Sequence, residues 1–139
     1  MLRILVPIDG SENSIHAVEF LIKKAARYAE PLEIHLLNVQ HPFPGTVRGV
    51  HEQAQQFHHE EGMQALAPAR ALLDEAGLNY SYHIGLGEVG ETIAEYAKLK
   101  RIDEIVMATH GRGAMMGLLM GSVTRNVLQL TTVPVLLVR

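Results

Sequence analysis

The chain alternates short apolar runs with segments in which apolar residues recur at helical spacing. Residues 2–8 are nearly all apolar, which is typical of a strand buried on both faces of a sheet, and residues 32–39 form a second, predominantly apolar strand. Residues 79–84 alternate apolar and polar positions, and this indicates a strand at the edge of the sheet. Two further strands are predicted over residues 102–108 and 133–138.

Helical patterns fill the spaces between these runs. The first follows Ser11, a residue suited to cap a helix N-terminus. The second covers residues 51–76 and ends at Gly77. We expect Pro68 to kink or split this helix, because proline removes a helix hydrogen bond. The remaining two helices are predicted over residues 89–99 and 122–130.

This strict alternation of strands and helices predicts an α/β fold of the Rossmann-like kind. We expect a single domain over residues 1–139, with an open five-stranded parallel sheet and helices on both faces. The length allows one substantial core. Ligands of such sheets bind beyond the carboxyl ends of the strands, at a topological switch point. Residues 9–11, 38–40 and 108–122 therefore hold the candidate binding chemistry.

Composition narrows the classes of function. Hydrophobic residues make up 47% of the chain, which argues against disorder. The net charge of −3 differs from the positive net charge that is typical of nucleic-acid-binding proteins. No apolar run approaches the length of a membrane span, and Asp9 comes too early for a signal peptide. We therefore expect a cytoplasmic protein with no nucleic-acid partner and no membrane insertion. The absence of cysteine excludes disulfides and thiolate chemistry.

A glycine-rich loop between a strand and a helix is the most informative feature of the chain. It follows the apolar run 105–107, includes His110, Gly111, Arg112 and Gly113, and reaches the helix at Gly121-Ser122. Bare backbone N–H groups and a helix start can together hold a phosphate, so this order predicts nucleotide binding. Ser122 is also a candidate N-cap. Arg112 is either a phosphate ligand or a solvated residue.

The same loop carries apolar residues, which we interpret as a local core cluster. A lid over the ligand and a contact with a second subunit are the alternatives. These residues are Met115, Met116, Leu118, Leu119 and Met120.

Residues 85–90 form a second glycine pattern, GxGxxG. A dinucleotide-binding fingerprint also needs an acid at the end of the following strand, and that strand ends in Met107-Ala108-Thr109. We therefore favour a helix start at which Gly87 or Gly90 eases the turn.

Histidines on the long helix suggest a metal site. His51, His58 and Glu61 could share one helix face, but a structural metal site needs about four well-placed ligands. We therefore favour a polar helix face, with pH sensing as an alternative. His110 is the histidine expected near phosphates.

Taken together, the chain resembles the nucleotide-binding branch of the universal stress protein family. The motif of that family is Gly-x2-Gly-x9-Gly-[Ser/Thr], and here Gly111, Gly121 and Ser122 match while Ala108 replaces the first glycine. Residues 4–11 and 36–39 look like the first two strands of the family. Residues 123–127 and 133–138 look like its last helix and strand, so the similarity covers essentially the whole chain.

This resemblance implies the strand order 3-2-1-4-5, with ATP (or ADP or AMP) between the first and fourth strands. Mg²⁺ often accompanies the nucleotide, and relatives often form homodimers through the last strand, here residues 133–138. Asp9 would contact the ribose, and Val39 would border the adenine. The full set of expected binding residues is Pro7, Ile8, Asp9, Val39, Met107, Ala108, His110, Gly111, Arg112, Gly113, Gly121, Ser122 and Val123.

The leading hypothesis is an ATP-binding stress-response or signalling protein. Nucleotide occupancy would favour one arrangement of the 41–50 and 109–120 loops, which an unidentified protein partner reads. No catalytic residue is assigned, because the sequence shows neither a base for an attacking water nor a phosphate-binding lysine. Slow hydrolysis or self-phosphorylation is the most that we expect.

Two alternatives stay open at this stage. A nucleotide-free dimeric interaction module would fit Ala108, although Gly111 and Gly121-Ser122 argue against it. A small nucleotidyl or phosphoryl transfer enzyme would need a cluster of reactive groups above the sheet.

Overall fold

The computed structural model describes residues 1–43, 51–110 and 120–139, which form one parallel five-stranded sheet. The strand order is β3-β2-β1-β4-β5, as the family resemblance implies. The alternating strand β3 lies at one edge, as its pattern predicts, and β5 lies at the other. Val133 and Pro134 precede the last strand instead of belonging to it. The strands are β1 (Leu2–Pro7), β2 (Leu32–Gln40), β3 (Tyr80–Leu86), β4 (Glu104–Ala108) and β5 (Val135–Val138).

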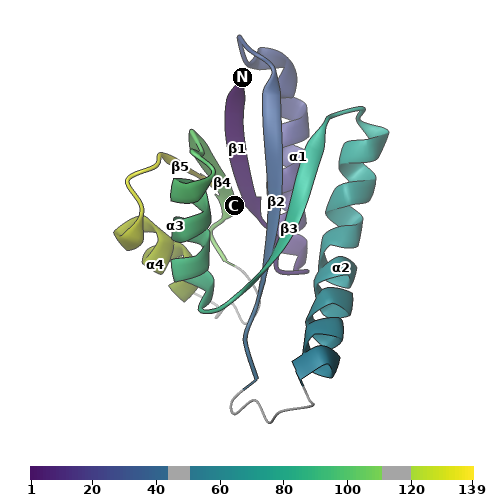
Figure 1. The fold of residues 1–139 in the computed structure, drawn as a ribbon. Coiled ribbons are helices and arrows are strands. Elements are labelled where there is room, and N and C mark those ends of the chain that lie inside the picture. Colours follow the sequence, from purple (N-terminus) through teal and green to yellow (C-terminus); the bar gives the residue numbers. More distant parts are fainter. Residues whose placement is uncertain (44–50, 111–119) are drawn as a thin grey trace.

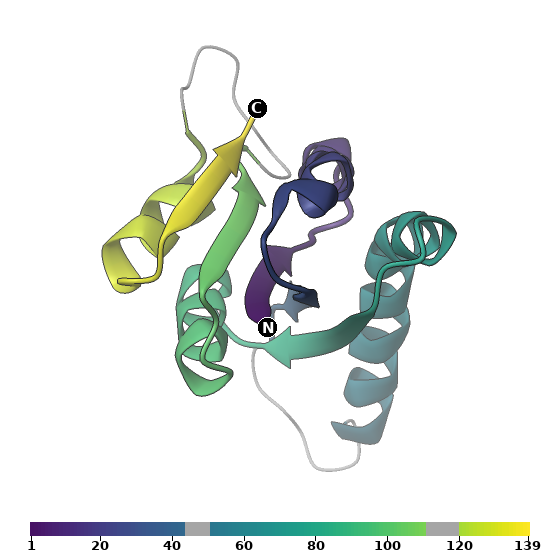
Figure 2. The same cartoon turned by 90° about the horizontal axis from the view of Figure 1, so that it is seen from above.

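Helices cover both faces of the sheet, which confirms the predicted fold class (Figures 1 and 2). On one face lie α1 (Glu12–Lys24) and α2 (His51–Glu75), with a short 3₁₀ helix, η1 (Ala25–Arg27), after α1. The other face carries α3 (Val89–Leu99) and α4 (Ser122–Leu130). Within the described ranges, none of these helices combines the length and the apolar character that a bilayer crossing requires.

The central strands separate two apolar cores. Ile4 and Leu36 pack on the side of α1 and α2, and Leu5 and Leu37 pack on the side of α3 and α4. All four side chains are fully or almost fully buried. Because successive side chains of a strand point to opposite faces, a strand covered on both sides reads as a continuous apolar run.

Capping groups and one glycine set the helix ends. The Ser11 hydroxyl accepts from the backbone N–H of Ser14 at 3.3 Å, which confirms the predicted cap of α1. Gly77 has a φ of +69°, a conformation that favours glycine, and α2 ends just before it. The cap of α3 is Glu88, whose carboxylate accepts from the first-turn N–H groups at 3.1 and 2.8 Å.

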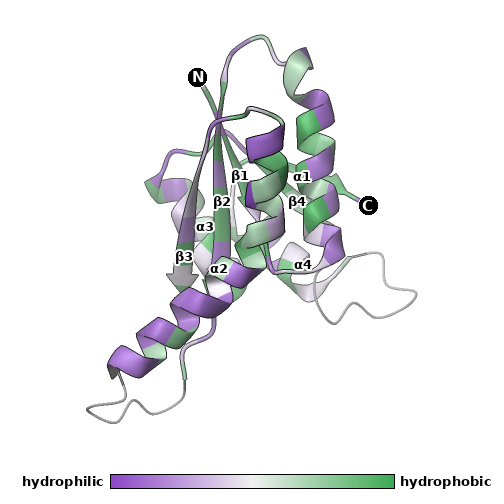
Figure 3. Ribbon diagram, turned by 90° about the vertical axis from the view of Figure 1, so that its right-hand side faces the viewer, coloured by the Kyte–Doolittle hydropathy of each residue, from purple (hydrophilic) through white to green (hydrophobic). Residues whose placement is uncertain are grey.

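Pro68 lies inside α2, which runs unbroken from His51 to Glu75. Of the two effects predicted for Pro68, a kink or a split, the split is therefore wrong. Both Pro68 and Gln64, the residue one turn before it, are exposed. The carbonyl group that loses its intrahelical donor thus lies on the solvent side, where water can replace that donor. The start of α2 extends beyond the strand ends and is strongly hydrophilic (Figure 3).

Candidate functional site

A cavity of about 530 Å³ lies beyond the carboxyl ends of β1, β2 and β4. It occupies the switch point of the sheet, because the chain leaves β1 toward one face and β4 toward the other. Every predicted binding residue within the described ranges lines it. Gly111, Arg112 and Gly113 lie outside the described residues, as do Met115, Met116, Leu118 and Leu119. The predicted residues that line the cavity are Pro7, Ile8, Asp9, Val39, Met107, Ala108, His110, Gly121, Ser122 and Val123.

The first turn of α4 forms one end of the cavity. Gly121 occupies the N-cap position without a side-chain cap, and Ser122 is the first helical residue. The prediction of Ser122 as the N-cap is therefore wrong. The first N–H groups of a helix have no acceptor within the helix, and the helix dipole gives this end partial positive charge. The start of α4 can therefore hold an anion.

Two hydrogen bonds fix this helix start against the end of β4. The Gly121 N–H donates to the Thr109 carbonyl at 2.7 Å. The buried Thr124 hydroxyl donates to the Ala108 carbonyl at 3.1 Å, with the Thr109 carbonyl at 3.2 Å. Thr124 was not predicted, although a hydroxyl in the first turn of a helix often bonds to a neighbouring backbone group. The anion-binding end is thus positioned by the sheet.

Arg125 adds a donor, and His110 adds a ring nitrogen, at the same end of the cavity. The ring Nδ1 of His110 lies 3.3 Å from the Thr109 hydroxyl. Its Nε2 is buried and meets no hydrogen-bond partner among the described residues. A buried unpaired polar atom is costly, so an oxygen acceptor on a ligand would relieve it. Arg125 belongs to the exposed side of α4, and sequence reasoning missed it.

Asp9 follows β1 and shapes the turn into α1. One carboxylate oxygen accepts from the backbone N–H of Ser11 at 2.9 Å and from the Ser11 hydroxyl at 2.5 Å. Asp9 is therefore a turn residue that also lines the cavity. The turn fixes the position of the carboxylate at the floor of the site.

The end of the cavity away from α4 is built from β2 and α2. Val39, Gln40 and His41 line it at the end of β2, and Glu61 and Ala65 line it from α2. Sequence reasoning placed residues 38–40 among the candidate binding chemistry but missed Glu61 and Ala65. The spacing of Glu61 and Ala65, one helical turn apart, is the pattern that could have indicated it.

The GxGxxG segment shapes a helix start, as predicted. Gly87 has a φ of +150°, which side-chain-bearing residues rarely adopt. A Cβ placed on Gly90 would lie 2.8 Å from the Asn126 Cβ of α4. Gly90 therefore lets α3 and α4 pack closely.

His58 is only 8% exposed, so the prediction of a polar helix face is wrong at this position. Its ring stacks on Phe43 with centroids 4.8 Å apart and meets Phe57 edge-on at 5.8 Å. Apolar neighbours cover the ring because α2 returns alongside the end of β2. In the part of the chain that the structure describes, no three His, Asp or Glu side chains are grouped to hold a metal.

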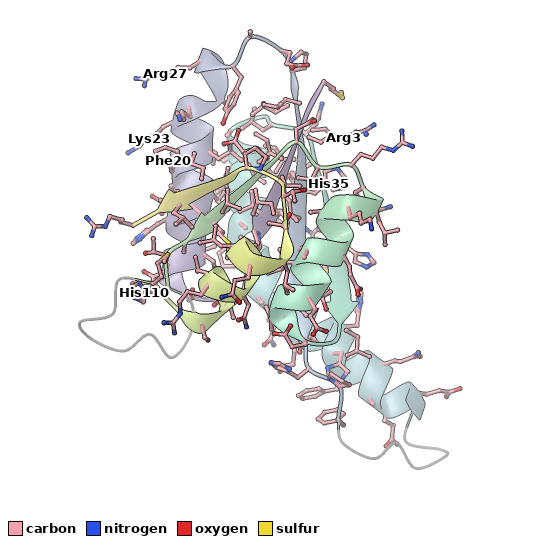
Figure 4. All side chains as sticks on the ribbon, turned by 90° about the vertical axis from the view of Figure 1, so that its left-hand side faces the viewer. Arg3, Phe20, Lys23, Arg27, His35 and His110 are labelled. Carbon is pink, nitrogen blue, oxygen red and sulfur yellow. The ribbon has the colours of Figure 1, made fainter. Side chains whose placement is uncertain are left out.

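A second polar cluster lies at the opposite, amino end of the sheet, where Figure 4 places Arg3 and His35. The Nε2 atom of His35 lies 2.9 Å from the Glu33 carboxylate, and its Nδ1 lies 2.8 Å from the Tyr96 hydroxyl. A carboxylate can only accept, so Nε2 donates, and in the neutral ring Nδ1 accepts from Tyr96. The hydrogen bond from His35 is the main cause that lowers the pKa of Glu33. Burial, followed by the Glu33 charge, raises the pKa of Tyr96.

The lowered pKa of Glu33 predicts an acid-dependent contribution to stability. A carboxyl whose pKa falls on folding stabilises the protein above its ordinary value of 4.5, and this contribution disappears as pH falls through the folded value. Glu33→Gln should therefore lower the unfolding free energy at pH 7 and flatten its decline below pH 4.5. Urea denaturation across this range measures both effects. The exposed Glu95→Gln is the control, and identical pH profiles for the two variants would contradict the assignment.

Comparison with known proteins matches this fold and this site to one family. The model of the universal stress protein family matches residues 1–139. Universal stress protein MJ0531 of Methanocaldococcus jannaschii is 32% identical over 139 residues, covering 99% of this chain and 81% of that protein. The structure of universal stress protein UspA from Lactobacillus plantarum shares the fold with a TM-score of 0.83 at 23% identity, covering 99% of this chain and 97% of that one. The chain belongs to the universal stress protein family.

Three further structures of this fold are described with a nucleotide. They are a universal stress protein in complex with cAMP, an Arabidopsis thaliana family protein with AMP bound, and an Archaeoglobus fulgidus universal stress protein in complex with dAMP. Their identities to this chain are 23%, 20% and 20%, with TM-scores of 0.73, 0.71 and 0.68. They cover 99%, 99% and 100% of this chain, and this chain covers 97%, 91% and 98% of them. At these identities the likeness concerns the fold.

Proposed function

We propose that this universal stress protein binds an adenine nucleotide, ATP being the form expected, in the cavity at the switch point. The observation that carries the proposal is the uncapped start of α4, which opens onto the same cavity as the ends of β1 and β2. The adenine nucleotides in three structures of the same fold support it. What those three ligands share is an adenine base on a ribose or deoxyribose that carries one phosphate.

The two ends of the cavity differ chemically, and this difference would orient the bound nucleotide. Its phosphates would lie at the start of α4, where His110 and Arg125 supply further donors. The base would then extend along the strand ends toward Val39, because β1 lies between β4 and β2. Asp9, at the end of β1, would face the ribose between them. Ser122 and Val123 would contribute backbone N–H groups to the phosphates, and Gly121, whose own N–H donates to Thr109, would let the phosphates approach them.

Magnesium would enter this site with the nucleotide. Mg²⁺ is usually held by one or two carboxylates together with substrate phosphates. Asp9 and Glu61 are the carboxylates lining the described part of the cavity, and because Glu61 lies at the end away from α4, Asp9 is the one that would share the ion with the phosphates. When bound, the ion would neutralise phosphate charge. The donors around the cavity suit binding more than turnover, so we propose a switch whose occupied form a protein partner recognises.

The first experiment is to identify the resident ligand. The protein is purified without added nucleotide and denatured, and released small molecules are identified by mass spectrometry. Calorimetric titration with ATP, ADP and AMP then gives the affinities. A released adenine nucleotide or saturable binding supports the proposal. A protein without nucleotide that binds none of the three favours the alternative, a nucleotide-free interaction module, with the Ala108 methyl group as the feature that blocks the site.

Asp9→Ala should weaken ATP binding by about tenfold, since a charge-assisted hydrogen bond to the ribose is lost. The preference for ATP over dATP should also decrease, because the 2′-hydroxyl loses its acceptor. Calorimetry with both nucleotides measures the two affinities. Asp9→Asn is the matched control, because its amide oxygen can still accept from Ser11. An unchanged ratio of ATP to dATP affinity in Asp9→Ala would remove Asp9 from the ribose site.

We also propose a homodimer formed through β5. This strand lies at an edge of the sheet, so one side of its backbone has no neighbouring strand among the described elements. All four of its residues are only partly buried. Such an edge invites pairing with another chain. Sedimentation of the purified protein measures the mass of the assembly.

A further inference from the structure

A chain of amide hydrogen bonds connects the floor of the cavity to its wall at the end of β2. The side-chain amide of Asn38 donates to the backbone carbonyl of Ile8 at 2.8 Å. The side-chain amide of Gln40 in turn donates to the Asn38 side-chain oxygen at 2.7 Å. Asn38 is only 3% exposed, and all three residues line the cavity.

The direction of this chain follows from its first acceptor. A backbone carbonyl can only accept, so the amide of Asn38 must turn its NH₂ group toward Ile8. The Asn38 oxygen therefore faces Gln40, and the NH₂ group of Gln40 must donate the hydrogen bond to it. Gln40 can then offer a ligand its carbonyl oxygen, Oε1, and the second hydrogen of its NH₂ group, each at a fixed position. The backbone of β1 thus determines, through two side chains, where the wall presents its acceptor.

The Gln40 acceptor stands at the base end of the cavity. The anion-binding start of α4 lies on the β4 side of β1, and Gln40 lies on the opposite side, at the end of β2. Glu61, also on this wall, carries a carboxylate that is an acceptor as well when ionised. A base that reaches this wall therefore meets acceptors, and an exocyclic amino group is the complementary donor.

We propose that Gln40 reads the 6-amino group of the purine, with Asn38 as the positioning residue that fixes the orientation of its amide. This inference rests on the proposed function and adds a basis for choosing adenine. A 6-oxo purine would place an oxygen against Oε1, and two acceptors that face each other lose a hydrogen bond. Because Asn38 is buried beneath the wall, it acts through Gln40 and not on the ligand.

The test compares AMP with inosine monophosphate, which carries a 6-oxo group in place of the 6-amino group. We expect the wild type to bind AMP at least about tenfold more tightly, a difference of about 1.4 kcal/mol. Gln40→Met keeps a side chain of similar length but removes the amide. It should reduce the preference to below about threefold, mainly by weakening the binding of AMP.

Asn38→Leu tests the positioning role, because Gln40 keeps its amide but loses the partner that orients it. The preference for AMP should fall as in Gln40→Met, and the double variant should show no further fall. Thermal melting checks that each variant is folded. Asn38→Asp gives a second measurement: a protonated carboxyl can donate to Ile8 and accept from Gln40, whereas a carboxylate cannot donate. Its preference for AMP should therefore decrease between pH 5 and pH 8.

The outcomes separate this inference from the proposed function. If the wild type binds neither AMP nor ATP, the proposed function fails and the inference fails with it. If AMP binds but Gln40→Met keeps the full preference, Gln40 does not read the base, and nucleotide binding stands. If folded Asn38→Leu keeps the preference that Gln40→Met loses, or if the preference in Asn38→Asp does not decrease with pH, the positioning role of Asn38 is overturned.

Discussion

Gly121→Val should weaken ATP binding by roughly a hundredfold while leaving the fold intact. Gly121 is the N-cap of α4, with φ −75° and ψ 166°. This extended conformation is open to any residue, so the backbone should accept valine without strain. The branched side chain would instead stand where a phosphate must approach the first N–H groups of α4. Calorimetry measures the affinity, and thermal melting shows whether the fold survives.

Gly121→Ala is the matched control for this prediction. Its single methyl group should produce an intermediate loss of affinity if space beside the backbone is the cause. An unchanged affinity in Gly121→Val would mean that the phosphates lie elsewhere, and the site assignment would then be wrong. A variant that melts much earlier than the wild type would instead show that Gly121 serves the fold.

Leu66→Ala should lower the unfolding free energy by about 3 kcal/mol. Leu66 is fully buried on α2, in the core formed with α1 and the central strands. Its removal costs the transfer energy of the lost methyl-bearing groups and leaves a cavity that rigid neighbours cannot fill. Urea denaturation measures the loss. Leu99→Ala, at a position 80% exposed, is the control and should change stability by less than about 0.5 kcal/mol.

The fold could be predicted from sequence because each of its elements has a recognisable pattern within one short segment of the chain. The continuous apolar runs of β1 and β2, the alternation in β3 and the cap at Ser11 each reflect one short segment and its solvent exposure. The strand order came from the family resemblance, since these local patterns do not specify which strands become neighbours. The wrong predictions concern Pro68, His58 and Ser122. Each depended on how its helix sits against the rest of the molecule.

The two ends of the proposed site differ in how far the sequence predicts them. The phosphate end has a sequence pattern, because glycines, a hydroxyl and a helix start follow one another along the chain. At the proposed base end, the sequence indicated residues 38–40 only as the end of a strand, since Asn38 and Gln40 acquire their roles only when β1 comes to lie beside β2. Glu61 and Ala65 reach the cavity because α2 extends past the strand ends. Such residues belong to a surface made by distant segments, and a linear pattern cannot display it.

The central position of β1 has a consequence for the synthesis of this protein. Among the five strands of the sheet the ribosome makes this one before the others, yet one of its edges is completed only by β4, where Leu5 pairs with Ile105. Until about a hundred further residues have emerged, that edge exposes unpaired N–H and C=O groups beside strongly apolar side chains. Chain fragments that stop before β4 would therefore tend to associate, and folding should proceed no faster than this long-range pairing allows. The strand that leads to Asp9 is thus the first of the five to be translated and one of the last to be fully paired.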